Sequence, residues 1–250
     1  MDLSVVIPLY NESKSIEELN KWITNTLISE RISFEIIYID DGSSDGSWDI
    51  IKRLANNSDN IKGILFSKNF GKSQALNAGF IECHGTYVAT LDADLQDSPE
   101  EIPEMINKIK KGNLDLISGW KKKRYDSLVF KKIPSKLFNF VARYTSGIKI
   151  HDFNCGIKVY KSDVIKSIDV YGDMHRFIPI IAMNEGYNKI DEHIVKHQAR
   201  KFGKTKFGME RYIRGFLDLI SVSFVYKFRK RPMHFFGSLG VISFLIGFIS

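Results

Sequence analysis

The sequence has little cysteine and no cluster of histidines and cysteines, and these absences remove several classes of protein. Only Cys83 and Cys155 are cysteines among the 250 residues. Two cysteines cannot build a disulfide scaffold or a cysteine-based zinc site, and they suit a reducing cytosol. The six histidines are scattered along the chain, and no Cys/His cluster indicates zinc.

Several other signals are missing. Residues 3–8 have the pattern of a strand and lack the length and flanks of a secretory signal, so we expect none at the start of the chain. Residues 69–73 (NFGKS) only partly resemble a phosphate-binding loop and lack the Walker spacing, which favours a helix-capping turn over an ATPase site. The sequence contains no internal repeat and no low-complexity linker.

Acidic residues are too few to balance the basic ones, and the net charge is +7. Such a charge suits either nucleic acid or an anionic membrane. Its distribution favours the membrane, because Lys227, Arg229, Lys230 and Arg231 directly precede residues 233–250, which contain no charged side chain. A membrane helix needs about 20 apolar residues, and flanking basic residues stay on the cytoplasmic side. We therefore expect the start of a transmembrane segment at 233–250 and no nucleic-acid partner.

The preceding segment, 208–232, mixes apolar and basic residues in a helical pattern. An ordinary amphipathic core helix would have nearly the same pattern, but the adjacent apolar segment favours a helix lying in the membrane interface. The expected organisation is a globular domain at 1–207, an amphipathic juxtamembrane segment at 208–232 and the beginning of a transmembrane region at 233–250. This arrangement would anchor the domain to the cytoplasmic face of the cell membrane.

Short apolar runs alternate with helical segments through the first part of the chain. This alternation predicts an α/β fold with a mostly parallel, Rossmann-like sheet flanked by helices. The predicted strands are 3–8, 34–40, 61–67, 87–91, 114–120, 156–160 and 189–197. The predicted helices are 13–29, 44–56, 73–83, 99–111, 134–145 and 174–184.

Polar clusters follow four of the predicted strands, at residues 10–12, 40–42, 69–72 and 92–94. Ligands of such sheets bind beyond the carboxyl ends of the strands. Because these four clusters would meet at one edge of the sheet, the sequence predicts a ligand site there.

The run Asp92-Ala93-Asp94-Leu95-Gln96 is the most specific of these clusters. Carboxylates two residues apart point to opposite faces of a strand, but a turn after the strand can direct both at one ion. Their oxygens suit Mg²⁺ or Mn²⁺, which commonly bridge carboxylates to substrate phosphates. The following Ser98 and Pro99 have the pattern of a helix start, so we assign Asp97 to structure and leave the site to the residues before it.

These residues together resemble family 2 glycosyltransferases of the GT-A fold, in the branch that acts on polyprenyl phosphates. That branch includes dolichyl-phosphate mannosyltransferase and bacterial undecaprenyl-phosphate glycosyltransferases. The resemblance extends from Leu3 to Ile249. It rests on residues 8–12, which match the opening nucleotide-binding motif, residues 39–43, which match the second, the run 92–96, and a late basic pair.

The resemblance implies roles for individual residues. It places Asp92, Asp94 and Gln96 on the metal, and Arg200 and Lys206 on phosphate groups, and these five form the expected catalytic set. Lys121 stands where relatives often carry arginine, and a lysine keeps the charge without the bidentate fork. The residues expected to bind the nucleotide-sugar are Pro8, Tyr10, Glu12, Ile39, Asp41, Ala93 and Lys121.

The expected reaction is an inverting, metal-dependent transfer of a sugar from a nucleotide-sugar to a polyprenyl phosphate. A UDP-sugar is favoured as donor, and GDP-mannose is possible. A phosphate acceptor is ionised at neutral pH, so it needs positioning more than a general base. Two alternatives remain open: a family 2 enzyme that acts on a glycan or protein hydroxyl, and a non-catalytic membrane scaffold that binds nucleotide-sugar.

Overall fold

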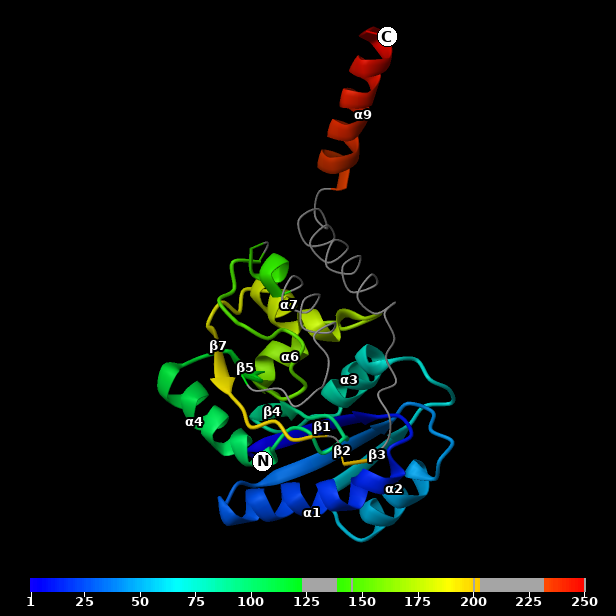
Figure 1. Ribbon diagram of the computed structural model, residues 1–250, viewed down its shortest axis with the longest axis vertical. Coiled ribbons are helices and arrows are strands. Elements are labelled where there is room, and N and C mark those ends of the chain that lie inside the picture. Colours follow the sequence, from blue (N-terminus) through cyan, green and yellow to red (C-terminus); the bar gives the residue numbers. More distant parts are fainter. Residues whose placement is uncertain (123–138, 145, 200, 203–231, 250) are drawn as a thin grey trace.

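A seven-stranded sheet forms the centre of the protein (Figure 1). The computed structural model describes residues 1–122, 139–144, 146–199, 201–202 and 232–249. The strands lie in the order β3-β2-β1-β4-β6-β5-β7. Their bounds are β1 Leu3–Leu9, β2 Phe34–Asp40, β3 Ile61–Leu65, β4 Tyr87–Thr90, β5 Leu116–Trp120, β6 Lys158–Lys161 and β7 Ile190–Ile194.

Most strand pairs are parallel, as the sequence predicts. β1 runs parallel to β2 and β4, β2 to β3, and β5 to β7, whereas β6 lies antiparallel between β4 and β5. Leu9 is paired with Asp40, and Asp40 with Leu65, so β1, β2 and β3 end level with one another. The predicted polar loops therefore do follow strands that end at one edge of the sheet.

Helices cover both faces of the sheet (Figure 1). On one face, α1, α2 and α4 pack on the strands, and on the other α3, α6 and α7 do so. The helices are α1 Ser13–Ser29, α2 Ser47–Asn56, α3 Lys72–Ile81, α4 Ile102–Gly112, α6 Ser162–Lys166, α7 Ile178–Asn184 and α9 Pro232–Ile249, with short 3-10 helices η1 Pro99–Glu101 and η2 Met174–Phe177.

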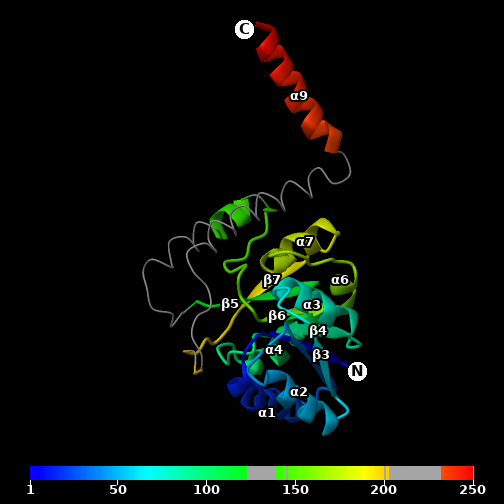
Figure 2. The ribbon, with the colours of Figure 1, turned by 90° about the vertical axis from the view of Figure 1, so that its right-hand side faces the viewer.

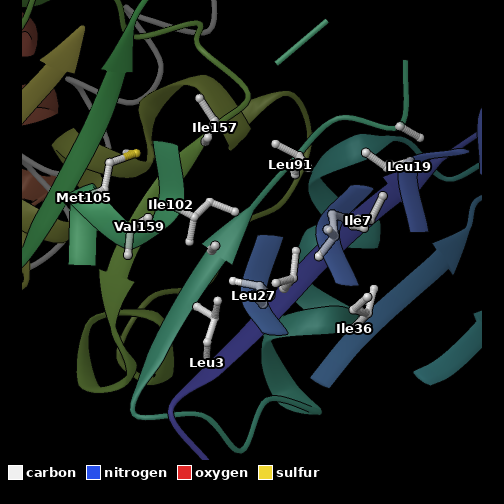
Figure 3. Close-up of a cluster of buried hydrophobic side chains, with 14 of the residues drawn as sticks. Leu3, Ile7, Leu19, Leu27, Ile36, Leu91, Ile102, Met105, Ile157 and Val159 are labelled. Atoms are coloured by element: carbon white, nitrogen blue, oxygen red, sulfur yellow. The ribbon is translucent and has the colours of Figure 1, made fainter. Parts of the chain in front are cut away.

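The alternation of side chains along β1 divides the core into two layers. Val5 and Ile7 point into the layer beneath α1, whereas Val6 points into the layer beneath α3. Figure 3 shows the first layer, where Ile7 lies among side chains that include Leu19 and Leu27 of α1. Each fully buried aliphatic side chain stabilises the fold by roughly 1.5–3 kcal/mol, so the two layers fix the sheet against its helices.

The predicted helix at 99–111 is divided into η1 and α4. Ser98 caps η1 by accepting a 3.3 Å hydrogen bond from the Glu100 N–H, which confirms the predicted start at Pro99. The helix α6 was not predicted, because five residues are too few to show a helical period. Of the predicted helix 134–145, the structure describes 139–144, which are helical.

The C-terminal helix α9 lies apart from the sheet and its covering helices (Figures 1 and 2). It exposes Met233, Phe236, Phe244 and Phe248. No helix in the described part of the chain is both long and apolar enough to cross a membrane. The expected transmembrane segment at 233–250 is therefore unconfirmed. Residues 208–231 lie outside the described residues, and the predicted domain boundaries stay predictions.

Candidate functional site

Asp92 follows β4 and forms an ion pair with Lys72, the first residue of α3. The Lys72 Nζ contacts Asp92 Oδ1, and each side chain is 32% exposed. The two residues come from the ends of β3 and β4, which are separated in the sheet by β2 and β1. The contact depends on the loop at 66–71, which leads from β3 to the start of α3, and on the packing of α3 on β1.

The surroundings of Asp92 keep it ionised. Burial opposes its charge, but Lys72, with additional effect from Lys121 and His175, holds the pKa of the Asp92 carboxyl well below its usual range. An ionised carboxylate at the carboxyl edge of the sheet is a ligand for a hard cation. Asp92 therefore has the charge state that the predicted metal site requires.

A glycine gives the Asp92 carboxylate its space. A Cβ atom on Gly156 would lie 2.5 Å from Asp92 Oδ2 and 2.6 Å from its Cγ. Any larger residue at position 156 would displace the carboxylate. Beside it lies a cavity of about 20 Å³, which can hold about one water molecule. It is lined by Pro8, Lys72, Leu76, Thr90, Leu91, Asp92, Phe153, Asn154, Cys155, Gly156, Lys158, Tyr160, His175, Arg176 and Ile178.

Positive charge predominates around this cavity. Lys72, Lys158 and Arg176 line it with one carboxylate, Asp92. Lys158 is buried and its ammonium donates to the Cys155 carbonyl. Burial lowers the pKa of Lys158, and the nearby Lys72 contributes to the same shift. These charges would therefore attract an anion to the edge of the cavity, whose own volume admits only about one water molecule.

The chain turns after Asp92, as predicted for a metal-binding loop. Leu95 adopts a positive φ of 60°, and Asp94 Oδ1 accepts a 3.2 Å hydrogen bond from the Gln96 N–H. Gln96 is held from the other side, because its carbonyl accepts a 2.8 Å bond from the Gln198 N–H. Two carboxylates and an amide oxygen in a partly exposed turn form a donor set that fits Mg²⁺ or Mn²⁺.

Asp41 organises the loop that carries Lys72. Its carboxylate accepts hydrogen bonds from the N–H groups of Phe70 (2.7 Å) and Gly71 (2.9 Å), directly before α3. Burial raises the pKa of Asp41. Gly42 lies beside the same loop at a φ of +74°, where a Cβ would come within 2.5 Å of the Lys68 backbone. Asp41, which is predicted to bind the nucleotide-sugar, thus also has a structural role, and its contact with the nucleoside stays a prediction.

The first predicted nucleotide motif lies at the end of β1 and is tied to the β2 loop. The Asn11 N–H donates to Ser43 Oγ at 2.8 Å, and the Glu12 N–H donates to Ser47 Oγ at 3.1 Å. Tyr10 exposes 37% of its surface at this edge. Its position allows the predicted stacking on a base.

Three other predicted nucleotide-binding residues are buried. Pro8 lines the cavity beside Asp92. Ile39 has no exposed surface and packs in the core, so only its backbone can reach a ligand. Ala93 is 4% exposed, and its side chain packs in the layer beneath α1.

Lys121 is held by a buried carboxylate. Its Nζ lies 2.6 Å from Oδ1 of Asp97, whose side chain has no exposed surface, and His197 Nδ1 lies 3.6 Å from the same oxygen. Burial opposes both charges, yet Asp97 raises the pKa of Lys121 and Lys121 lowers that of Asp97. The ion pair agrees with a structural role for Asp97, and the predicted diphosphate contact of Lys121 stays a prediction. Arg200 and Lys206 lie outside the described residues.

A second group of possible ligands lies on η1, α4 and β7. Glu101, Glu104 and His193 place one ligand atom each within 4.8 Å of one another, in the only such group among the residues that the structure describes. His193 Nε2 lies 3.1 Å from Glu101, and its Nδ1 lies 2.6 Å from the Lys108 ammonium. Because both ring nitrogens already have partners, this group is better explained as a structural network.

The sequence places Lys72 in one of the four polar loops of the predicted ligand site but assigns it no role, because the likeness of residues 69–73 to a phosphate loop is only partial. His175, Lys158 and Arg176 are not predicted as site residues. His175 contacts Ser73 of α3, with 3.1 Å between His175 Nδ1 and Ser73 Oγ. Lys158 and Arg176 lie in no sequence motif that would identify them as site residues.

Comparison with known proteins identifies relatives of this chain. The model of the family described as glycosyl transferase family 2 matches residues 4–169. A dodecaprenyl-phosphate galacturonate synthase from Rhizobium johnstonii is 37% identical over 243 residues, which cover 96% of this chain and 72% of the relative. An undecaprenyl-phosphate 4-deoxy-4-formamido-L-arabinose transferase from Pseudomonas syringae pv. syringae is 34% identical over 220 residues, covering 88% of this chain and 64% of that protein.

The fold is similar to that of a solved enzyme. Glucosyl-3-phosphoglycerate synthase from Mycobacterium tuberculosis, in complex with UDP, has a TM-score of 0.67 at 18% identity and is matched over 89% of this chain and 80% of the other. The same enzyme has been solved with Mn²⁺, UDP-glucose and glycerol 3-phosphate, with a TM-score of 0.64 at 17% identity, over 90% and 79% of the two chains. At these identities the likeness shows the fold, and it supports the GT-A architecture.

Proposed function

The chain belongs to glycosyl transferase family 2, and on this premise we propose that it transfers a sugar from a nucleotide-sugar to a polyprenyl phosphate. The observation that carries the proposal is the position of Asp92, which follows β4 at the carboxyl edge of the sheet and pairs with Lys72, in a chain matched over 96% of its length to a polyprenyl-phosphate sugar transferase. The sugar of that relative is galacturonate, and the other relative transfers a modified arabinose. The sequence motifs do not indicate which of these sugars this chain transfers.

The donor would lie across the ends of β1, β2 and β4. Tyr10 would stack on the base, and Asp41 would contact the nucleoside while holding the α3 loop in place. Asp92, Asp94 and Gln96 would hold Mg²⁺ or Mn²⁺, which supplies Lewis-acid stabilisation of the leaving diphosphate. We favour UDP as the nucleotide, with GDP as the alternative.

The acceptor would approach the anomeric carbon with an ionised phosphate oxygen. This nucleophile needs orientation and partial neutralisation of its charge, and it does not need a strong general base. Lys72, Lys158 and Arg176 provide positive charge beside Asp92, and Arg200 and Lys206 are proposed to add to it. Direct displacement would invert the anomeric centre.

The proposed location is the cytoplasmic face of the cell membrane. Apolar side chains of α9, including Phe244, Leu245, Ile246 and Phe248, are exposed and would be covered by lipid. The basic residues at 227–231 precede this helix and would face anionic headgroups. The lipid acceptor would then be presented at the same surface as the catalytic domain.

A competition experiment tests the function. The full chain is incubated with a panel of UDP- and GDP-sugars and Mn²⁺, with undecaprenyl phosphate and a glycan acceptor offered together, and the products are identified by mass spectrometry. We expect glycosylated lipid phosphate from one donor, its loss in EDTA and its loss in Asp92→Asn. Transfer to the glycan alone would replace the proposal with the hydroxyl-acceptor alternative. Donor binding without any product would favour a non-catalytic scaffold.

A further inference from the structure

The Lys72–Asp92 ion pair places a cation of the protein on the first carboxylate of the proposed metal site. From this geometry we infer that Lys72 competes with the divalent metal for Asp92, and that the donor diphosphate relieves the competition. Lys72 would then couple metal binding to donor binding. The inference rests on the proposed metal role of Asp92 and adds a function for a residue outside the predicted ligand set.

The two oxygens of Asp92 have different surroundings. Oδ1 contacts the Lys72 ammonium, and a Cβ atom on Gly156 would lie 2.5 Å from Oδ2 and 2.9 Å from Oδ1. A metal ion therefore has little room on the Gly156 side of the carboxylate. A metal ion that binds Oδ1 would meet the Lys72 ammonium, and two cations on one oxygen repel each other strongly.

The Lys72–Asp92 ion pair is placed so that the lysine can leave the carboxylate and a metal ion can replace it. Both side chains are about one-third exposed, so water reaches the pair and screens it. Lysine is a flexible point charge whose ammonium can swing away without moving α3. The position of the helix is held separately, by the hydrogen bonds from Phe70 and Gly71 to Asp41.

Displacement leaves Lys72 in a region of positive charge. Lys158 is close enough for the charge of Lys72 to contribute to lowering the Lys158 pKa, after burial, and both residues line the same cavity with Arg176. Without an anion, an arriving metal ion would add charge to this region. A diphosphate would supply the missing anion for both the metal and Lys72, and the N-terminus of α3 would favour the same charge.

Thermodynamic linkage then makes a specific prediction. If the diphosphate raises the affinity for metal by releasing Lys72, removing the lysine charge must raise the affinity of the nucleotide-free protein and reduce the additional effect of nucleotide. Because the ion pair is partly exposed, we expect its removal to change the metal affinity of the nucleotide-free protein by about three- to tenfold. A lysine that only binds phosphate would leave metal affinity without nucleotide unchanged.

The test measures Mn²⁺ binding by electron paramagnetic resonance of the free ion, with and without UDP, and with GDP in a parallel series. The variants are Lys72→Met, the charge-preserving Lys72→Arg, and a control, Lys52→Met, which removes an exposed pair with Asp49 (2.8 Å) on α2. Circular dichroism checks that each variant is folded. We expect Lys72→Met to bind Mn²⁺ more tightly without nucleotide and to gain less from it. Lys72→Arg keeps the charge and should bind Mn²⁺ no more tightly than wild type, and Lys52→Met should stay close to wild type.

Equal or weaker Mn²⁺ binding by nucleotide-free Lys72→Met would overturn the inference, as would an equal gain in Lys52→Met. Absence of Mn²⁺ binding in wild type, with and without nucleotide, would also overturn it. None of these measurements requires sugar transfer. A protein that shows the expected coupling but glycosylates no lipid phosphate would retain the inference and lose the proposed function.

Discussion

Asp41 accepts a 2.9 Å hydrogen bond from the backbone N–H of Gly71, thirty residues further along the chain. This contact joins the loop after β2 to the start of α3. It therefore connects the predicted nucleoside-binding aspartate with Lys72, the partner of the predicted metal ligand. The predicted nucleotide-binding and metal-binding residues are thus joined through one short segment of backbone.

The first prediction concerns this contact. Asp41→Asn replaces one of two accepting oxygens by an NH₂ group, which cannot accept from the Phe70 or Gly71 N–H. We expect a loss of about 1–3 kcal/mol in the free energy of unfolding, measured by urea denaturation, and weaker UDP binding by calorimetry. Asp49→Asn, an exposed change on α2, is the control. Unchanged stability in Asp41→Asn would show that the loop does not depend on this carboxylate.

The second prediction concerns the buried ion pair of Asp97 with Lys121. Lys121→Met leaves an ionised carboxylate buried without its cation, and we expect a loss of about 3–5 kcal/mol in the free energy of unfolding. Adding Asp97→Asn to the same protein should recover most of that stability. Urea denaturation of the single and double variants measures the coupling, and Lys122→Met, at the exposed neighbour, is the control. If the changes in the free energy of unfolding of the two single variants simply added in the double variant, a direct ion pair between Lys121 and Asp97 would be contradicted.

The third prediction concerns Gly156, whose missing side chain leaves room for Asp92. Gly156→Ala should displace the carboxylate and reduce the transfer rate by about tenfold to a hundredfold, and it should weaken Mn²⁺ binding. Gly237→Ala adds a methyl group where no atom lies within 4 Å, so this control should be unaffected. Full activity in Gly156→Ala would mean that Asp92 can move without loss.

The fourth prediction concerns the pH dependence of stability at Glu35, whose side chain is 2% exposed. Burial opposes its charge, but Lys62 at 2.9 Å and hydrogen bonds from Ser4 and the His84 N–H lower the pKa of Glu35 below its usual value. Because the folded pKa is depressed, the stabilisation is present above the unfolded pKa of about 4.3 and is lost as pH falls through the folded pKa.

Chemical denaturation between neutral and acidic pH measures this contribution. The free energy of unfolding of the wild type should decrease as the pH is lowered past about 4. Glu35→Gln should show a shallower decrease, because position 35 no longer titrates. Parallel curves for the two proteins would rule out a contribution from Glu35.

Local patterns in the sequence were sufficient for most of the fold. The predicted strand 34–40 and helix 13–29 agree with β2 and α1 at both ends, because periodicity and turn residues act over a few neighbouring positions. The turn after Asp92 and the cap at Ser98 are local for the same reason. The edge at which the polar loops meet followed from the parallel order of the strands.

Contacts between distant segments were decided by the tertiary structure. Lys72 meets Asp92 because the loop at 66–71 leads from β3 past two intervening strands to the start of α3, and the spacing of the two residues carries no sign of that path. Lys121 was predicted to contact diphosphate, and that role stays a prediction. The structure adds its pairing with Asp97, which depends on how the end of β5 packs against the loop before η1.

The sequence by itself thus determined the alternating α/β plan, the family and the acidic motif, since each depends on residue types within short windows or on their order along the chain. Only the tertiary structure decided which cation lies on Asp92, which carboxylate holds Lys121, and that Gly156 makes room for the site. These are through-space relationships, and packing alone brings their partners together.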